Sequence, residues 1–100
     1  MQIHSAYFWL KTGLTEDDIQ SFEEGLASLT TSETVESGHV GKPARTEPRD
    51  VVDSSYSYGL VLCFETVDAY DRYQSSDIHQ QFVADHADKW DRVQVYDIQT

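Results

Sequence analysis

The chain has 100 residues, a formal net charge of −11 and 39% hydrophobic residues, which suffices for one small domain with its own core. Eighteen acidic residues against seven basic ones repel phosphate groups and anionic lipids, so we expect no nucleic-acid and no membrane partner. The single cysteine, Cys63, cannot form an intrachain disulfide, and its apolar surroundings predict a small buried side chain. No export signal is recognised at the N-terminus, so a cytoplasmic protein is expected.

The chain begins with a predicted strand and a predicted helix. Residues 2–10 carry apolar side chains in both alternate sets of positions, which predicts a strand covered on both faces. Thr15, followed three residues later by Asp18, is a variant of the capping box, so a helix should begin there and end near residues 30–31. Gly25 allows this helix to pack closely against a neighbour. The inward stripe at the helical period consists of Ile19, Phe22, Leu26 and Leu29.

A weak strand, a long loop and a strong strand are predicted in the middle of the chain. Residues 33–41 alternate weakly, which indicates an edge strand. Residues 42–55 are irregular and hold three of the seven basic residues. A loop of this length is commonly a lid, a binding element or a solvated connection. Residues 56–64 have two largely apolar alternate sets, so this strand is also expected to be covered on both faces.

Two helical segments and a last strand complete the chain. Thr66 is expected to cap a short helix that runs to Tyr73, and Asp77 to cap a second segment. The side chains expected to face inward on that second segment are Ile78, Phe82 and Val83. Residues 90–98 alternate as a fourth strand.

The predicted order of elements is β-α-β-β-α-β, the ferredoxin-like α+β pattern with a four-stranded antiparallel sheet. Helices in this pattern cover only one face of the sheet, whereas the central strands are apolar on both faces. A second copy of the chain is the simplest cover for the other face. We therefore expect a homodimer that forms a dimeric α+β barrel.

The chemistry that the sequence offers is acid–base chemistry. None of the four histidines has a partner at metal-ligand spacing, and no phosphate-binding or dinucleotide-binding glycine loop is present, so we expect no metal and no cofactor. Tyr73 and His79 flank the break between the two helical segments, which can bring them onto one wall. Asp97 could accept from one imidazole nitrogen and leave the other free as a base. The same three side chains could instead form a structural hydrogen-bonded network.

Motifs along nearly the whole chain resemble those of one family, the stress-responsive A/B barrel (Dabb) domain proteins. They are I-H at 3–4, T-E-D-D-I at 15–19, G-x-x-G-K-P at 38–43, Y-S-Y-G-L-V-L-C-F-E at 56–65, Y-x-x-x-x-x-H at 73–79 and V-Q-V-Y-D at 93–97. The resemblance implies a single domain over residues 1–100 with a ferredoxin-like fold that dimerises into an α+β barrel.

The resemblance also implies a site. A plant polyketide cyclase of this family carries out an intramolecular aldol condensation. By its motifs, His79 would remove a proton alpha to a carbonyl, Tyr73 would hydrogen-bond the enolate, and Asp97 would orient His79, with no cofactor. The substrate-binding residues that the resemblance implies are His4, Leu26, Tyr58 and Trp90. Leu26 and Tyr58 stand where the cyclase has a tyrosine and a histidine, which disfavours the cyclase's own substrate.

Three functions follow from these expectations. The first is a cofactor-free enzyme or binder of small molecules, polyketide-cyclase-like, whose pocket is gated by the loop at 42–55 and draws an acidic ligand through the basic residues there. The second is a non-catalytic homodimeric stress-response or interaction module, in which the His–Tyr–Asp network ties a helix to the last strand. The third is a haem-handling protein or quinol monooxygenase, because such proteins use the same barrel.

Overall fold

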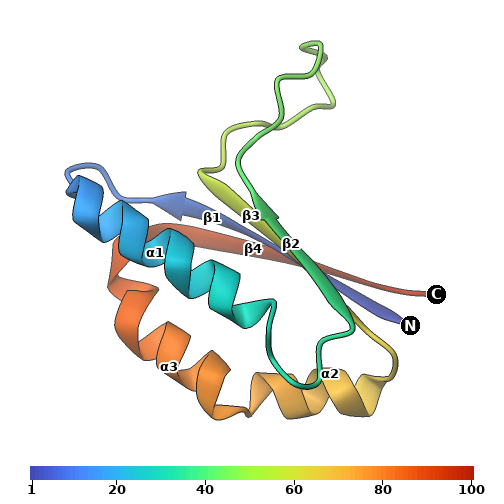
Figure 1. Cartoon of the computed structure of the whole chain (residues 1–100). Helices are drawn as coiled ribbons and strands as arrows, with labels where there is room; N and C mark the ends of the chain where they lie inside the picture. The colour runs from blue at the N-terminus through green and yellow to red at the C-terminus, as the bar shows by residue number, and fades with distance from the viewer.

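Four strands form one antiparallel sheet in the order β2-β3-β1-β4 in the computed structural model, which describes residues 1–100 (Figure 1). The strands are β1 (Gln2–Leu10), β2 (Ser37–Gly41), β3 (Tyr58–Phe64) and β4 (Trp90–Gln99). Each neighbouring pair is antiparallel. With the helices, the chain order is β-α-β-β-α-β, so the predicted ferredoxin-like α+β fold is confirmed.

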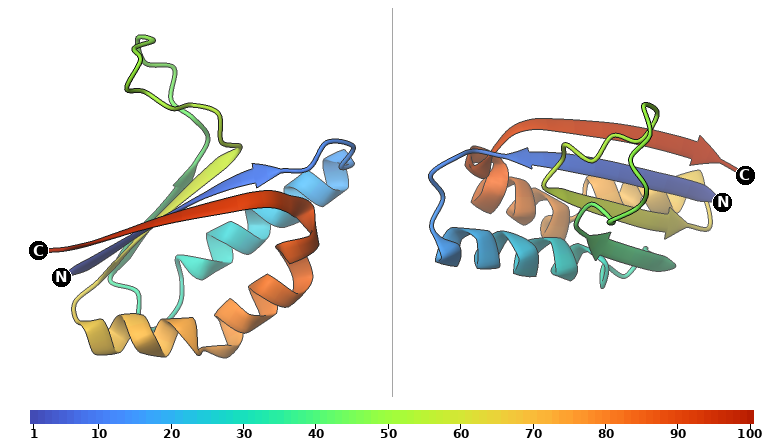
Figure 2. Two further views of the ribbon diagram at one scale, coloured as in Figure 1. Left: turned by 180° about the vertical axis from the view of Figure 1, so that it is seen from behind. Right: turned by 90° about the horizontal axis from the view of Figure 1, so that it is seen from above.

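All the helices lie on one side of this sheet (Figure 2). They are α1 (Glu16–Leu29), α2 (Val67–Gln74), α3 (Asp77–His86) and the short 3-10 helix η1 (Ala87–Lys89). The predicted capping box is present, because the Thr15 hydroxyl accepts from the Asp18 backbone N–H at 3.1 Å and the Asp18 carboxylate accepts from the Thr15 N–H at 3.1 Å. No helix combines the length and the apolar character needed to cross a membrane.

Several predicted boundaries differ from the structure, three of them for a visible reason. Strand β2 begins at Ser37 and not at residue 33, because pairing with β3 starts where Ser37 lies opposite Cys63. Strand β3 begins at Tyr58 and not at residue 56. Helix α3 is capped by Ser76 and not by Asp77, since the Ser76 hydroxyl accepts from the His79 backbone N–H at 3.4 Å.

The core lies between the helices and one face of the sheet. On β3 the alternation is strict, with every second side chain from Tyr58 to Phe64 buried. These side chains belong to a cluster of twelve buried apolar residues to which α1 contributes Phe22, Leu26 and Leu29. A Cβ atom at Gly25 would lie 2.6 Å from Nε2 of His86, so the close packing expected at this glycine is confirmed.

The other face of the sheet has no helix over it, and we call it the open face. It carries half-buried side chains from three strands, such as Tyr7, Trp9 and Val61. Cys63 is on this face too, half-buried, and not in the core. The loop between β2 and β3 rises from the sheet on the side opposite the helices (Figure 2).

Candidate functional site

A cavity of about 270 Å³ lies between the helix-covered face of the sheet and helices α2 and α3. Eleven of its fourteen lining residues are hydrophobic. Its polar groups are few and come from β1, α2 and α3, namely His4, Tyr70, Tyr73, Gln74 and His79. A mostly apolar cavity with a few convergent polar groups is the usual form of a small-molecule site.

Tyr73 lies at the centre of these polar groups. Its residue is 1% exposed, and its ring centroid is 6.5 Å from that of His4 and 5.1 Å from that of His79. Burial raises the pKa of Tyr73 and the charge of Tyr70 raises it further, with no hydrogen bond contributing. The Tyr73 hydroxyl makes no hydrogen bond within the chain, and Tyr73 lines the cavity.

His79 stands at the start of α3 with its ring edge against Tyr73. Burial lowers its pKa from 6.5, the charge of His4 lowers it further, and a hydrogen bond with the Gln74 backbone acts in the opposite direction. The imidazole of His79 is thus neutral at neutral pH and able to accept a proton.

Asp97 pairs with His4 and not with His79, which corrects the expected arrangement. His4 on β1 and Asp97 on β4 lie directly opposite each other in the strand register. Nδ1 of His4 is 2.7 Å from one carboxylate oxygen of Asp97, and the Tyr70 hydroxyl donates to the other at 3.2 Å. Because an ionised carboxylate only accepts, Nδ1 of His4 must carry the proton.

The remaining expected residues lie in different places. Trp90 lines the cavity and stacks on Phe82 with ring centroids 5.9 Å apart. The structure does not bring Leu26 and Tyr58 to the cavity, because Leu26 is enclosed in the core. Tyr58 turns toward α1, where its hydroxyl donates to the Glu23 carboxylate. Burial, followed by the Glu23 contact, raises the pKa of Tyr58 to about 12.

Sequence reasoning missed Tyr70 and the mouth of the cavity. Tyr70 precedes Tyr73 by three residues on α2, a spacing that puts both on one helix face and could have been noticed. Val83, Val93 and Val95 line the cavity and are 40–42% exposed. Val83 faces the cavity, in line with the expectation that it points inward, and the cavity opens between α3 and β4.

The charges around the cavity do not favour an acidic ligand, because no lysine or arginine lines it and the carboxylate of Asp97 is hydrogen-bonded to His4 in its wall. No residue of the loop at 42–55 lines the cavity either, so the structure does not place the loop at this cavity as expected. The same lack of cations does not fit the propionates of haem. No three His, Cys, Asp or Glu side chains lie close enough to hold a metal ion.

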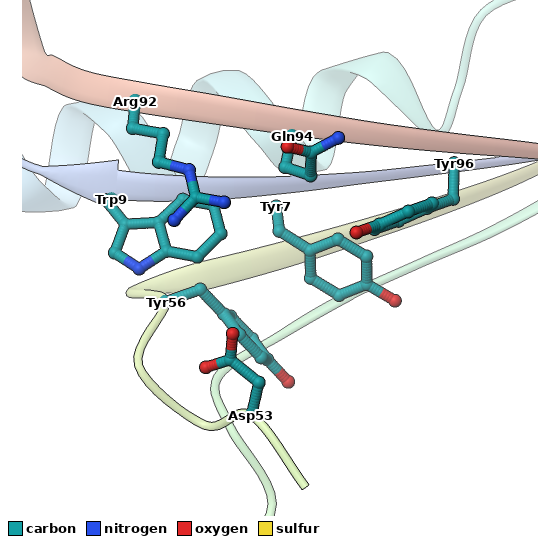
Figure 3. A pocket seen from close by; sticks show the side chains of 7 residues that line it. All are labelled: Tyr7, Trp9, Asp53, Tyr56, Arg92, Gln94 and Tyr96. Atoms are coloured by element: carbon teal, nitrogen blue, oxygen red, sulfur yellow. The ribbon is translucent and has the colours of Figure 1, made fainter. Parts of the chain in front are cut away.

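A second hollow, of about 280 Å³, lies on the open face between β1, β4 and the long loop (Figure 3). Its lining residues are Tyr7, Trp9, Asp53, Tyr56, Arg92, Gln94 and Tyr96. The Arg92 guanidinium lies over the Trp9 ring, 4.1 Å from its centroid, and the indole N–H of Trp9 donates to Ser55 at 3.0 Å. None of its side chains is a histidine or a cysteine, so it lacks a proton acceptor suited to neutral pH.

Comparisons with known proteins agree with this architecture. A protein of Arabidopsis thaliana shares the fold with 22% identity and a TM-score of 0.81, over 100% of this chain and 95% of the other. A dimeric ferredoxin-like protein of unknown function from Thermobifida fusca shares it with 16% identity and a TM-score of 0.79, over 99% of this chain and 90% of the other. A hydroxynitrile lyase from Passiflora edulis shares it with 14% identity and a TM-score of 0.79, over 97% of this chain and 90% of the other. A search of curated proteins found no match. The stress responsive A/B barrel domain matches residues 3–100, and the chain therefore belongs to the Dabb family.

Proposed function

We propose that the protein binds a small uncharged carbonyl compound in the cavity and removes a proton alpha to the carbonyl, without a metal or an organic cofactor. The observation that carries the proposal is the hydroxyl of Tyr73, which makes no hydrogen bond within the chain and whose ring lies near two imidazoles. A ligand oxygen that accepts a hydrogen bond from this hydroxyl gives it a partner, so the site favours a ligand with such an oxygen.

His79 is the proposed base. Its lowered pKa keeps the imidazole unprotonated at neutral pH, so it is ready to take the proton. In the proposed step the C–H bond breaks, the proton moves to a ring nitrogen of His79, and the electron pair passes to the carbonyl oxygen. The Tyr73 hydroxyl hydrogen-bonds the oxyanion that forms. Asp97 completes the proposed catalytic set and acts through His4, the histidine it contacts.

The cavity wall supports a small, neutral and largely apolar ligand. Its volume of about 270 Å³ is slightly below the usual range for ligand pockets, roughly 300–1,000 Å³. Trp90 and the valines at the mouth offer surface for an aromatic or aliphatic group, and no lysine or arginine offers a counter-charge. A hydroxynitrile lyase shares the fold, which supports the view that this scaffold can hold a small-molecule reaction.

Hydrogen–deuterium exchange tests the proposal without knowledge of the natural substrate. 2-Indanone, an uncharged ketone with benzylic α-protons, is incubated with the protein in D2O, and loss of its α-proton signal is followed by NMR. We expect exchange above the buffer rate, and a decrease of about 100-fold or more in His79→Gln, because one proton-transfer residue typically contributes that much. His39→Gln is the matched control, since His39 lies on β2 outside the cavity. Exchange that survives His79→Gln would contradict the role of His79.

We also propose that two copies associate through their open faces. This face leaves apolar and aromatic side chains from three strands without cover, and the ferredoxin-like protein of Thermobifida fusca is dimeric. Burial of such a surface is the main source of stability in a homodimer. Sedimentation velocity at micromolar concentration should give the mass of two chains, and a single-chain mass would contradict this association.

A non-catalytic module is the second candidate function. The observation that favours it is the network in which Asp97 bonds His4 and Tyr70, because it joins β1, α2 and β4 in the way a structural network would. In that case His79→Gln and Asp97→Asn lower the melting temperature. Neither the wild type nor any variant then exchanges the α-protons of 2-indanone above the buffer rate.

A further inference from the structure

The two imidazoles at the cavity have opposite electrostatic surroundings. His4 is hydrogen-bonded to a carboxylate, whereas no carboxylate hydrogen-bonds the ring of His79, which burial and the charge of His4 keep neutral. One imidazole bonded to a carboxylate beside a second imidazole without such a bond is an arrangement suited to an acid–base pair. Tyr73, whose ring lies near both imidazoles, marks the place where a carbonyl oxygen would be held.

Both oxygens of Asp97 are committed to the His4 side of the cavity. One accepts from Nδ1 of His4 at 2.7 Å and the other from the Tyr70 hydroxyl at 3.2 Å. Burial and the charge of Asp97 raise the pKa of Tyr70, so its hydroxyl keeps its proton and remains a donor. The carboxylate is thereby fixed in place, and it fixes the ring of His4 with Nδ1 protonated.

Because Nδ1 of His4 is hydrogen-bonded to Asp97, Nε2 is the ring nitrogen that remains for a ligand in the cavity. His4 lines the cavity with only 6% of its surface exposed. When His4 is charged, Nδ1 donates to Asp97 and Nε2 carries a second proton that no other group of the chain accepts. The titratable groups that face His4 are Asp97 from β4, Tyr70 and Tyr73 from α2, and His79 from α3. Asp97 is the one anion among them at neutral pH, and it stabilises the imidazolium.

We infer that His4 is the general acid of the cavity and that Asp97 and Tyr70 are positioning residues that hold its proton in place. The inference rests on the proposed function, in which His79 is the base. In the step, His79 takes the α-proton of the ketone as the C–H bond breaks. The electron pair forms the C=C bond, the Nε2–H bond of His4 breaks, and its proton moves to the carbonyl oxygen to give the enol. The reverse step, with protons exchanged with solvent, restores the ketone and both imidazoles.

The role of His4 predicts a particular pH dependence of exchange. A neutral His79 and a charged His4 must be present together, so the rate should rise and then fall with pH. Asp97→Asn removes the charge that stabilises the imidazolium, so the falling alkaline limb should move to lower pH while the acidic limb stays. On the alkaline side of the profile, the rate of Asp97→Asn should therefore fall below that of the wild type. Asp91→Asn is the matched control, because Asp91 is exposed on the same strand.

The experiment is the rate of 2-indanone deuteration from pH 5 to 9 for the wild type, Asp97→Asn, Asp91→Asn and Tyr70→Phe. The tautomer of His4 is read from its ring-nitrogen NMR shifts. We expect protonated Nδ1 in the wild type and a mixture of tautomers in Asp97→Asn. Tyr70→Phe should keep the shape of the profile with a decrease of less than tenfold. A purely structural Asp97 would change the melting temperature and leave the alkaline limb in place.

The outcomes separate the two proposals. If the wild type exchanges 2-indanone and Asp97→Asn follows the same pH profile, the acid role of His4 is overturned while the proposed function stands. If His4 carries its proton on Nε2 in the wild type, the assignment of the acid is overturned in the same way. If the wild type does not exchange the ketone at any pH, the proposed function fails, and the role of His4 fails with it.

Discussion

The two faces of the sheet carry hollows of similar size and different chemistry. The hollow on the helix-covered face, about 270 Å³, contains two imidazoles and a phenol without a partner. The open-face hollow, about 280 Å³, contains an arginine stacked on a tryptophan and a carboxylate already hydrogen-bonded to Ser55. The first has imidazoles that can exchange protons, and the second has a broad aromatic surface without a histidine. The proposed proton chemistry and the proposed self-association therefore use opposite sides of the same strands.

Strand β1 shows how one segment supplies both surfaces. Because successive side chains on a strand point to opposite faces, His4 and Phe8 face the helices and are buried, whereas Tyr7 and Trp9 are half-buried on the open face. A shift of one residue in the register would exchange the two sets. The difference between the two faces can be tested by substituting residues that are neighbours in the sequence and lie on opposite faces of the sheet.

The largest expected effect on stability comes from such a pair on β3. Leu62 is fully buried against the helices, and Val61 is half-buried on the open face. Leu62→Ala should lower the free energy of unfolding by about 2–5 kcal/mol, because it leaves a cavity in the core. Val61→Ala should lower it by less than about 1 kcal/mol, which urea denaturation at low protein concentration would measure. Equal losses in the two variants would show that both faces are equally covered in the single chain.

The second effect concerns self-association and not the fold. Val61→Arg places a charge in the middle of the open face, where an unpaired buried charge is strongly disfavoured. We expect sedimentation velocity to give a single-chain mass for this variant, with 2-indanone exchange reduced less than twofold. Gln81→Arg is the control, because Gln81 is exposed on α3 at the other side of the molecule. A two-chain mass for Val61→Arg would place the contact elsewhere.

Patterns among neighbouring residues were sufficient to predict the helices and strands, but they were insufficient to predict the side-chain contacts at the candidate site. The capping box at Thr15 and the period-two pattern of β3 depend on residues close in the chain, and both are confirmed. The partner of Asp97 depends on the register between β1 and β4, which joins residues 93 positions apart. No local pattern specifies that register, so the sequence analysis paired Asp97 with the wrong histidine. The direction of the Tyr58 hydroxyl toward Glu23 depends on α1 packing and was missed for the same reason.

The next expected effect is smaller and concerns two tyrosines on the helix-covered face. Substituting them by phenylalanine should change the stability of the fold in opposite directions. Tyr73→Phe removes a hydroxyl that has no hydrogen-bond partner in the chain, so stability should stay the same or rise by up to about 1 kcal/mol. Tyr58→Phe removes a hydroxyl bonded to Glu23 and should lower stability by about 1–2 kcal/mol. Exchange of 2-indanone should fall at least tenfold in Tyr73→Phe and remain unchanged in Tyr58→Phe. Equal stability losses would show that the Tyr73 hydroxyl has a partner after all.

The smallest expected effect is a change in how stability depends on pH. Burial lowers the pKa of His79 in the folded protein below its ordinary value of 6.5. Below pH 6.5 the unfolded chain therefore binds a proton at this residue more readily than the folded chain does, and stability decreases as the pH falls. Above pH 6.5 both states leave His79 neutral, so it contributes no slope there. The melting temperature of His79→Gln should therefore fall less steeply between pH 6.5 and 5 than that of the wild type, whereas His39→Gln should keep the wild-type slope. If the slope in His79→Gln were unchanged, the imidazole would be fully solvated, and the cavity would lack the burial that keeps its proposed base neutral.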